Sequence, residues 1–162
     1  MTATPLTPDP LDAYGADRLV TERTRHAALL DPVTGLPKWE LLLDRLDVAL
    51  AHCRRTGLLV AVFVLDSPKP YEGHDMDVAA LAGMLRASVR ACDTLARVGA
   101  RRFAVVCNDI RVDEDAALVA RRLVNRAGVI CRLGIALGTT GDTAEALLRE
   151  AVAEATMAAV TH

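Results

Sequence analysis

At 162 residues, the chain is long enough for one domain with a sizeable core and too short for two ordinary domains. Hydrophobic residues make up 52% of it and charged residues 25%, which is typical of a globular chain and excludes a disordered one. Its formal net charge of −2 provides no basic excess with which to bind nucleic acid.

The N-terminal residues, the longest apolar run and the cysteines predict the cellular compartment of the protein. Residues 1–10 contain three prolines and no apolar stretch, so they do not read as a signal peptide. The longest apolar run, Leu58 to Leu65, is too short to span a membrane. The four cysteines are widely spaced within apolar segments and match no zinc or redox motif. We therefore expect a soluble cytoplasmic protein with buried free thiols, and neither a metal nor another cofactor.

Two segments precede the predicted domain. Proline and small polar residues predict a flexible leader over residues 1–15. A helix is expected over residues 16–30, where a modest apolar stripe can pack on the domain or on a partner. Two prolines and a glycine then interrupt the helical pattern within residues 31–37. The rest of the chain, residues 31–162, is predicted to form a single domain.

Helical and extended patterns alternate through this domain. Residues 38–56 form the clearest helix, with its apolar side chains on one face and Gly57 at its end. Residues 58–65 are continuously apolar and rich in valine, which is typical of a strand covered on both faces. The predicted elements are a helix over 38–56, a strand over 58–65, a helix over 75–91, a hairpin over 95–108, a helix over 113–126, a strand over 129–137 and a helix over 142–160. Asp113 and Asp142 are the expected N-caps of the last two helices. This order predicts one layered α/β sheet packed by helices.

The hairpin carries two adjacent arginines at its turn. Its four-residue tip runs from Gly99 to Arg102, between two short apolar runs. Arg101 and Arg102 are candidates for binding an acidic partner or a phosphate. Charges at a hairpin tip also serve solubility and prevent unwanted strand pairing, and this purely structural interpretation is favoured.

Several motifs, in order along the chain, resemble those of GGDEF domains, the diguanylate cyclase family. The segment Asp31 to Pro37, DPVTGLP, is similar to the family's DxLTGLP motif. The strand that ends at Asp66, the segment ARVG before the hairpin tip and the later strand RLGIA, which is similar to the family's SxGIA, follow in the family's order. The resemblance covers residues 31–160. It implies the family's palm, an α/β fold (an α+β sandwich) with a five-stranded, mostly antiparallel sheet flanked by helices.

The resemblance also implies that catalysis has been lost. Active members join two GTP molecules across a dimer into cyclic di-GMP, and carboxylates hold Mg²⁺ against the triphosphates. One of these carboxylates corresponds to Asp66, but both acids of the GGDEF motif are replaced, by Arg101 and Arg102. Because cations at this place repel a metal ion, we expect neither a catalytic nor a metal-binding residue. Residues 31–162 are therefore interpreted as a degenerate GGDEF domain without enzyme activity.

Other contacts that the family makes to GTP are missing as well. The loop after Asp66 is shorter than in the family. Asp77 matches an aspartate that contacts guanine, but its asparagine companion is absent. The lysine expected in the last helix has no match within residues 155–160. Residues that the family uses to contact the metal, the phosphates and the base of GTP are thus replaced or missing.

One binding motif of the family is retained. Arg90 and Asp93 match the RxxD motif that binds cyclic di-GMP as an inhibitory site, five residues before the glycine of the hairpin tip. Among the arginines of the next helix, Arg121 is the best candidate to join this site, followed by Arg122. An arginine can grip a phosphate or a guanine edge with two hydrogen bonds, and a carboxylate can accept from guanine. Arg90 can equally be a cation in the last turn of its helix, with Asp93 beginning the next turn and pairing with Arg90 or Arg97.

Three functions are compatible with these features. The favoured one is an inactive GGDEF domain that binds cyclic di-GMP through Arg90, Asp93 and Arg121 as a receptor or adaptor. The second is a protein-interaction module that binds no nucleotide and uses helix 16–30 or Arg101 and Arg102. The third, a residual enzyme with Asp66 alone as metal ligand, is disfavoured. Because the family's fold dimerises, a homodimer remains open beside an unidentified protein partner.

Overall fold

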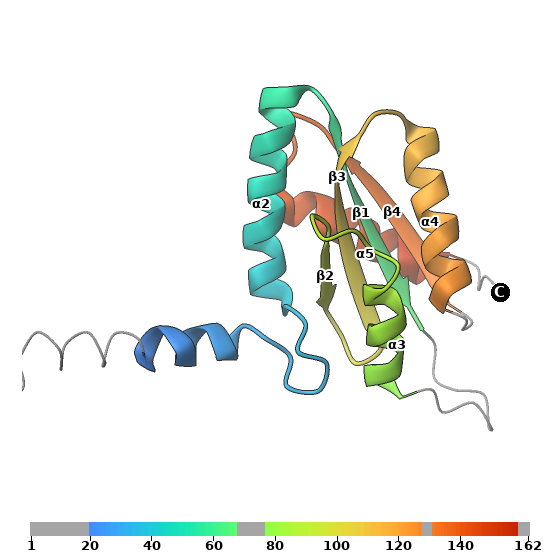
Figure 1. Cartoon of the computed structure of the whole chain (residues 1–162). Coiled ribbons are helices and arrows are strands. Elements are labelled where there is room, and N and C mark those ends of the chain that lie inside the picture. The colour runs from blue at the N-terminus through green and yellow to red at the C-terminus, as the bar shows by residue number, and fades with distance from the viewer. Residues whose placement is uncertain (1–19, 68–76, 128–130, 159–162) are drawn as a thin grey trace, which may run out of the picture.

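The computed structural model describes residues 20–67, 77–127 and 131–158, and the leader over residues 1–15 lies outside them (Figure 1). The described residues form one four-stranded sheet in the order β2-β3-β1-β4, in which every neighbouring pair is antiparallel. The strands are β1 (Leu59–Asp66), β2 (Thr94–Arg97), β3 (Arg102–Ile110) and β4 (Arg132–Gly138). The mixed α/β fold and the antiparallel sheet are confirmed. The resemblance implied five strands, but the described residues form four. The other apolar segments within the described residues have helical periodicity and fold as helices.

Helices cover both faces of the sheet. The helices are α2 (Trp39–Thr56), α3 (Val78–Arg86), α4 (Asp113–Ala127) and α5 (Ala144–Met157). One buried cluster joins Phe63 and Phe103 to α3 and α4. The other joins Val62 and Val64 to α2 and α5. Successive residues of β1 therefore face opposite layers, which explains why this strand is apolar without interruption (Figure 1).

Several predicted boundaries differ from the structure. Helix α3 ends at Arg86 rather than near residue 91, and the Ser88 hydroxyl donates to the carbonyl of Met84 as the chain turns. Asp113 is the first residue of α4 rather than its cap. The N-cap of α5 is Thr143, whose hydroxyl accepts from the amide of Ala146. Asp142 was wrongly predicted for this role because its carboxylate instead accepts from the amide and hydroxyl of Thr139.

Helix α5 packs unusually close to β4. A Cβ atom added to Gly134 would clash with the backbone of Ala151 and Ala155 in α5. Only glycine allows this approach, because any larger residue would push helix and strand apart. The close packing brings α5 onto the same sheet face as α2, beside the end of β1.

A short helix over residues 20–28 precedes the domain. All its described side chains are exposed, and Figure 1 shows the helix extending away from the sheet. The chain joins the domain through a bridge between Leu30 and Pro37. Within the described ranges, no helix combines the length and the apolar character needed to cross a membrane.

Candidate functional site

The carboxylate of Asp66 is paired with an arginine of the hairpin. Asp66 and Arg102 lie directly opposite each other in the β1–β3 register. An Nη2 group of Arg102 donates to Oδ2 of Asp66 at 2.7 Å. The two side chains are 28% and 24% exposed, so the pair is neither sealed from water nor free in it. Arg102 thus neutralises the carboxylate that the resemblance assigns to a metal.

A second arginine faces Asp66 from the other side. Arg132 of β4 lies directly opposite Asp66 in the β1–β4 register. Directly opposed residues of antiparallel strands project to the same face, so Arg102, Asp66 and Arg132 form a row across three strands. The side chain of Arg132 forms no hydrogen bond or ion pair with any residue that the structure describes, and its Nε atom is buried.

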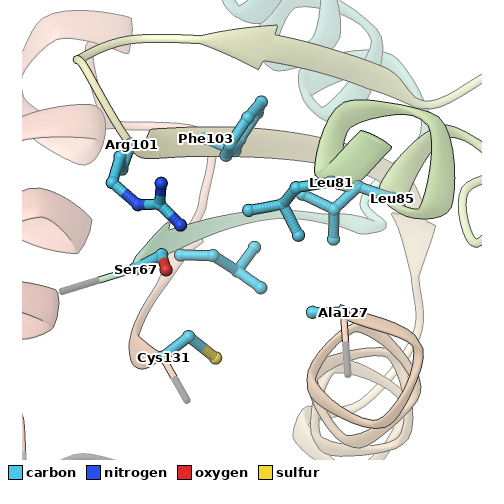
Figure 2. A pocket seen from close by; sticks show the side chains of 8 residues that line it. Ser67, Leu81, Leu85, Arg101, Phe103, Ala127 and Cys131 are labelled. Carbon is cyan, nitrogen blue, oxygen red and sulfur yellow. The ribbon is translucent and has the colours of Figure 1, made fainter. Parts of the chain in front are cut away.

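Arg101 does not project freely from the hairpin turn. Its carbonyl accepts a hydrogen bond from the amide of Ser67 at 3.1 Å. Its side chain points into a small, mostly apolar pocket on the α3 and α4 side of the sheet (Figure 2). The lining residues include Leu81, Phe103 and Cys131. Because Arg101 and Arg102 are both partly buried, and Arg102 is paired, a role in solubility alone does not account for them.

The hairpin tip is held by Arg97, which pairs with Asp31 and not with Asp93 as one interpretation of the sequence expected. Arg97 donates from Nη1 to both carboxylate oxygens of Asp31 at 3.0 Å. Its other nitrogens donate to the carbonyls of Gly99 at 3.2 Å and Ala100 at 2.7 Å. Burial alone would raise the pKa of Asp31, but hydrogen bonds from Thr34 and Arg97 outweigh burial and lower it. The available signal was that Asp31 and Arg97 both lie in the motifs that carry the family resemblance.

Arg90 and Asp93 form a turn between α3 and β2. The carboxylate of Asp93 accepts from the amide of Arg90 at 2.9 Å, and the amide of Asp93 donates to the carbonyl of Arg90 at 3.1 Å. Asp93 therefore begins a turn, as one interpretation predicted. Because α3 ends at Arg86, the interpretation of Arg90 as a cation in the last helical turn is wrong. The Arg90 side chain is exposed and pairs with no described residue.

The pKa of the buried Cys107 thiol indicates which charged side chains lie near this turn. Burial first, and then the carboxylate of Asp93, raise the pKa of the Cys107 thiol, whereas the charges of Arg122 and Arg90 act to lower it. Arg90, Asp93 and Arg122 are therefore all near enough to Cys107 of β3 to influence its pKa. Arg122 is partly buried, and its Nε and Nη2 atoms have no described hydrogen-bond partner. Its neighbour Arg121 is exposed on α4.

The remaining candidate residues have simpler surroundings. Asp77 is the N-cap of α3 and accepts from the amide of Ala79 at 3.2 Å. Most of the shortened loop after Asp66 lies outside the described residues. Among the residues that are described, no three His, Cys, Asp or Glu side chains are grouped to hold a metal ion.

Comparisons with known proteins agree with these motifs. The model of the family "Diguanylate cyclase, GGDEF domain" matches residues 28–159. The bifunctional diguanylate cyclase/cyclic di-GMP phosphodiesterase MucR of Pseudomonas aeruginosa is 37% identical over 107 residues. That match covers 61% of this chain and 16% of MucR, so the chain spans only a small part of this relative.

Solved structures share the fold. The GGDEF domain of PA1120 (TpbB or YfiN) from Pseudomonas aeruginosa is similar with a TM-score of 0.70 and 27% identity, over 80% of this chain and 87% of that one. The coiled coil and GGDEF domain of DgcB from Caulobacter crescentus, solved in complex with c-di-GMP, is similar with a TM-score of 0.70 and 22% identity. This second likeness covers 91% of this chain and 93% of the other, and at this identity it shows the fold alone.

Proposed function

The chain belongs to the diguanylate cyclase GGDEF domain family, and we propose that it is a catalytically inactive member that binds cyclic di-GMP as a receptor or adaptor. The two parts of this proposal rest on different places in the fold. Inactivity rests on the ion pair between Asp66 and Arg102. Binding rests on the turn that carries the exposed Arg90 and the Asp93 carboxylate.

The ion pair argues against a metal at Asp66. To bind Mg²⁺, Asp66 would have to give up its 2.7 Å hydrogen bond and leave Arg102 beside a divalent cation. The repulsion between a unit and a double charge at about 4 Å is of the order of several kcal/mol even with the screening usual near a protein surface. The residues present therefore do not fit the magnesium site that the family implies.

The turn of Arg90 and Asp93 carries the binding proposal. The exposed guanidinium of Arg90 is free to grip a phosphate through two parallel hydrogen bonds. One carboxylate oxygen of Asp93 accepts from the Arg90 amide, and its remaining acceptor capacity suits the N–H groups of guanine. Arg122 of α4 also influences the pKa of the Cys107 thiol, and its neighbour Arg121 is exposed. Cyclic di-GMP presents both phosphate and guanine, the two groups that this set of side chains recognises.

Calorimetric titration of cyclic di-GMP tests the receptor role. We expect binding to the unmodified protein and a loss of at least about tenfold in affinity for Arg90→Ala, because a charge-assisted hydrogen bond is removed. Arg121→Ala and Arg122→Ala, compared in parallel, identify the arginine of α4 that takes part. Arg55→Ala, which removes an exposed arginine at the end of α2, is the matched control. No binding at tens of micromolar ligand would reject the receptor role.

Incubation with GTP tests inactivity separately. We expect no cyclic dinucleotide by chromatography in the presence of Mg²⁺. Formation of any cyclic dinucleotide would overturn this part of the proposal and favour residual activity through Asp66.

The exposed helix over residues 20–28 supports a protein-interaction module as the alternative. Val20 on this helix is 62% exposed, and the helix extends away from the sheet (Figure 1). If this helix mediates association with a second copy or another protein, Val20→Asp should weaken that association in sedimentation or pull-down experiments. Arg101→Glu combined with Arg102→Glu tests the hairpin as the docking surface instead.

A further inference from the structure

Strand β4 has one side that pairs with no other strand among the described residues. It is the last strand in the order β2-β3-β1-β4, at the edge of the sheet (Figure 1). Its other side pairs with β1 in a regular antiparallel register. Such a ladder alternates pairs that exchange hydrogen bonds with pairs that do not, so every second residue of β4 points its N–H and C=O groups away from β1. An edge of this kind can pair with another strand.

One hydrogen bond identifies the outward residues of β4. The amide of Ile135 donates to Oε2 of Glu154 in α5 at 2.6 Å, so Ile135 points outward, and the alternation places Leu133 and Leu137 with it. No described residue accepts a hydrogen bond from the outward amides of Leu133 and Leu137. Glu154 is exposed, so its carboxylate can exchange the amide of Ile135 for water. The edge is therefore free except at Ile135, where the contact is readily broken.

The same three residues form an apolar row that is the same in both directions. Their side chains lie on the α3 and α4 face, where each is only partly buried against the core. A second copy of the strand, related by a two-fold axis at Ile135, brings Leu133 opposite Leu137 of the second copy and Ile135 opposite its own equivalent. Directly opposed residues project to the same face, so the two rows cover each other. The row is thus complementary to itself, as a two-fold interface between identical chains requires.

We propose that the edge of β4 binds the β4 edge of a second copy of this chain, and that Glu154 competes with the second copy for the amide of Ile135. Pairing centred on Ile135 provides about six hydrogen bonds between the chains, two for each opposed pair. The partly exposed side chains of both rows leave water at the same time. One pair of short strands makes a smaller interface than the standard size, so the dimer is weak and forms at about 100 µM protein and above.

This surface is separate from the sites considered under the proposed function. The turn of Arg90 and Asp93 leads into β2, which is at the opposite edge of the sheet from β4. The helix over residues 20–28 extends away from the sheet (Figure 1). Dimerisation through β4 can therefore fail without affecting the proposal for cyclic di-GMP, and the converse also holds.

Sedimentation equilibrium of the full chain without nucleotide, from about 10 µM to about 1 mM, tests the proposal. We expect a monomer–dimer equilibrium whose Kd rises at least about tenfold in Ile135→Lys, because two like charges then face each other across the axis. Glu154→Gln should lower the Kd several-fold, since a neutral amide oxygen competes less strongly than a carboxylate for the N–H of Ile135. The matched control is Leu118→Lys, which changes a 57% exposed apolar residue of α4 and should leave the Kd unchanged.

Circular dichroism verifies that each variant is folded. If Ile135→Lys does not fold, hydrogen exchange of the unmodified protein replaces it, and the amides of Leu133 and Leu137 should exchange more slowly as the protein concentration rises. A monomer at about 1 mM, an unchanged Kd in Ile135→Lys, or exchange that does not depend on concentration would each overturn the proposal. An unchanged Kd in Glu154→Gln would overturn the competition by Glu154. Loss of the dimer in Leu118→Lys or Val20→Asp would also overturn the proposal and assign association to α4 or to the helix over residues 20–28.

Discussion

Arg97 and Asp31, which are 66 residues apart in the chain, form a largely buried ion pair that ties the loop before α2 to the β2–β3 hairpin. The same guanidinium binds the carbonyls of Gly99 and Ala100 at the hairpin tip. The backbone amide of Arg97 donates to the carbonyl of Pro37, which strengthens the link. Arg97 and Asp31 therefore help to hold the conformation of the tip, together with the pair of Arg102 and Asp66.

Arg97→Ala should destabilise the protein by about 1.5–3 kcal/mol, because it removes several charge-assisted hydrogen bonds and leaves Asp31 without its cation. Urea unfolding measures the effect. Arg149→Ala is the matched control, since its pair with Glu145 is exposed and should contribute no more than about 0.5 kcal/mol. Equal losses in the two variants would contradict a structural role for the Arg97 link.

The unfolding free energy should fall in acid. Hydrogen bonds lower the pKa of Asp31, against the effect of burial, and those from Thr139 lower the pKa of Asp142. Carboxyls with a depressed folded pKa contribute stability above their unfolded pKa of 3.8 and lose it as the pH falls through the folded value. Asp31→Asn should be less stable at neutral pH and less sensitive to pH below about 4. Urea unfolding between pH 7 and 3 tests this, and an unchanged pH dependence in the variant would assign the acid sensitivity to other groups.

Arg102→Glu should create a site that responds to Mg²⁺. The substitution places a second carboxylate opposite Asp66, so the variant should melt at a lower temperature than the unmodified protein because like charges repel. Millimolar Mg²⁺ should raise the melting temperature of this variant, since an ion that binds only the folded state stabilises it. The unmodified protein should show no such rise. Adding Asp66→Asn to the variant should abolish the response, and a response that persists would place the metal elsewhere.

Much of the fold could be predicted because the strongest patterns are local. The apolar face predicted helix α2 to within one residue of its start and its exact end, and the uninterrupted apolar run of β1 predicted a strand buried on both faces. The end of α3 was less predictable. Val89 continues the apolar stripe after Arg86, so periodicity did not reveal that the chain turns at Ser88.

The site was less predictable because it depends on register and rotation. The sequence places Asp66 at the end of a strand but does not say that Arg102 and Arg132 lie opposite it on two different neighbours. Arg121 and Arg122 differ by about 100° around α4, so an uncertainty of one residue exchanges an exposed arginine for a partly buried one. The ion pair of Arg97 with Asp31 joins two segments that are far apart in the sequence, and a search for local motifs does not reveal such a pair.

Gly134→Ala should be strongly destabilising, and Gly83→Ala should be stabilising. A Cβ at Gly134 meets the backbone of α5, which must move, so we expect a loss of about 3 kcal/mol or more. Gly83 lies within α3 with nothing near its added Cβ, so alanine should gain about 0.5–1 kcal/mol from helix propensity. Thermal unfolding compares the two. A neutral Gly134→Ala would mean that α5 does not pack as closely on β4.

Cys92 should be the thiol that reacts with iodoacetamide in the folded protein. Cys92 is exposed, so the expectation that all four thiols are buried is wrong for this residue. Cys107 is buried and its pKa is raised by burial and by Asp93, so its nucleophilic thiolate is scarce at pH 8. Because Cys92 lies between Arg90 and Asp93 in sequence, saturating cyclic di-GMP should slow its labelling, and Arg90→Ala should remove that protection. Mass spectrometry of the labelled peptides measures both effects. Fast labelling of Cys107 in the native protein would contradict its burial, and unprotected Cys92 in the presence of bound ligand would place cyclic di-GMP away from Arg90.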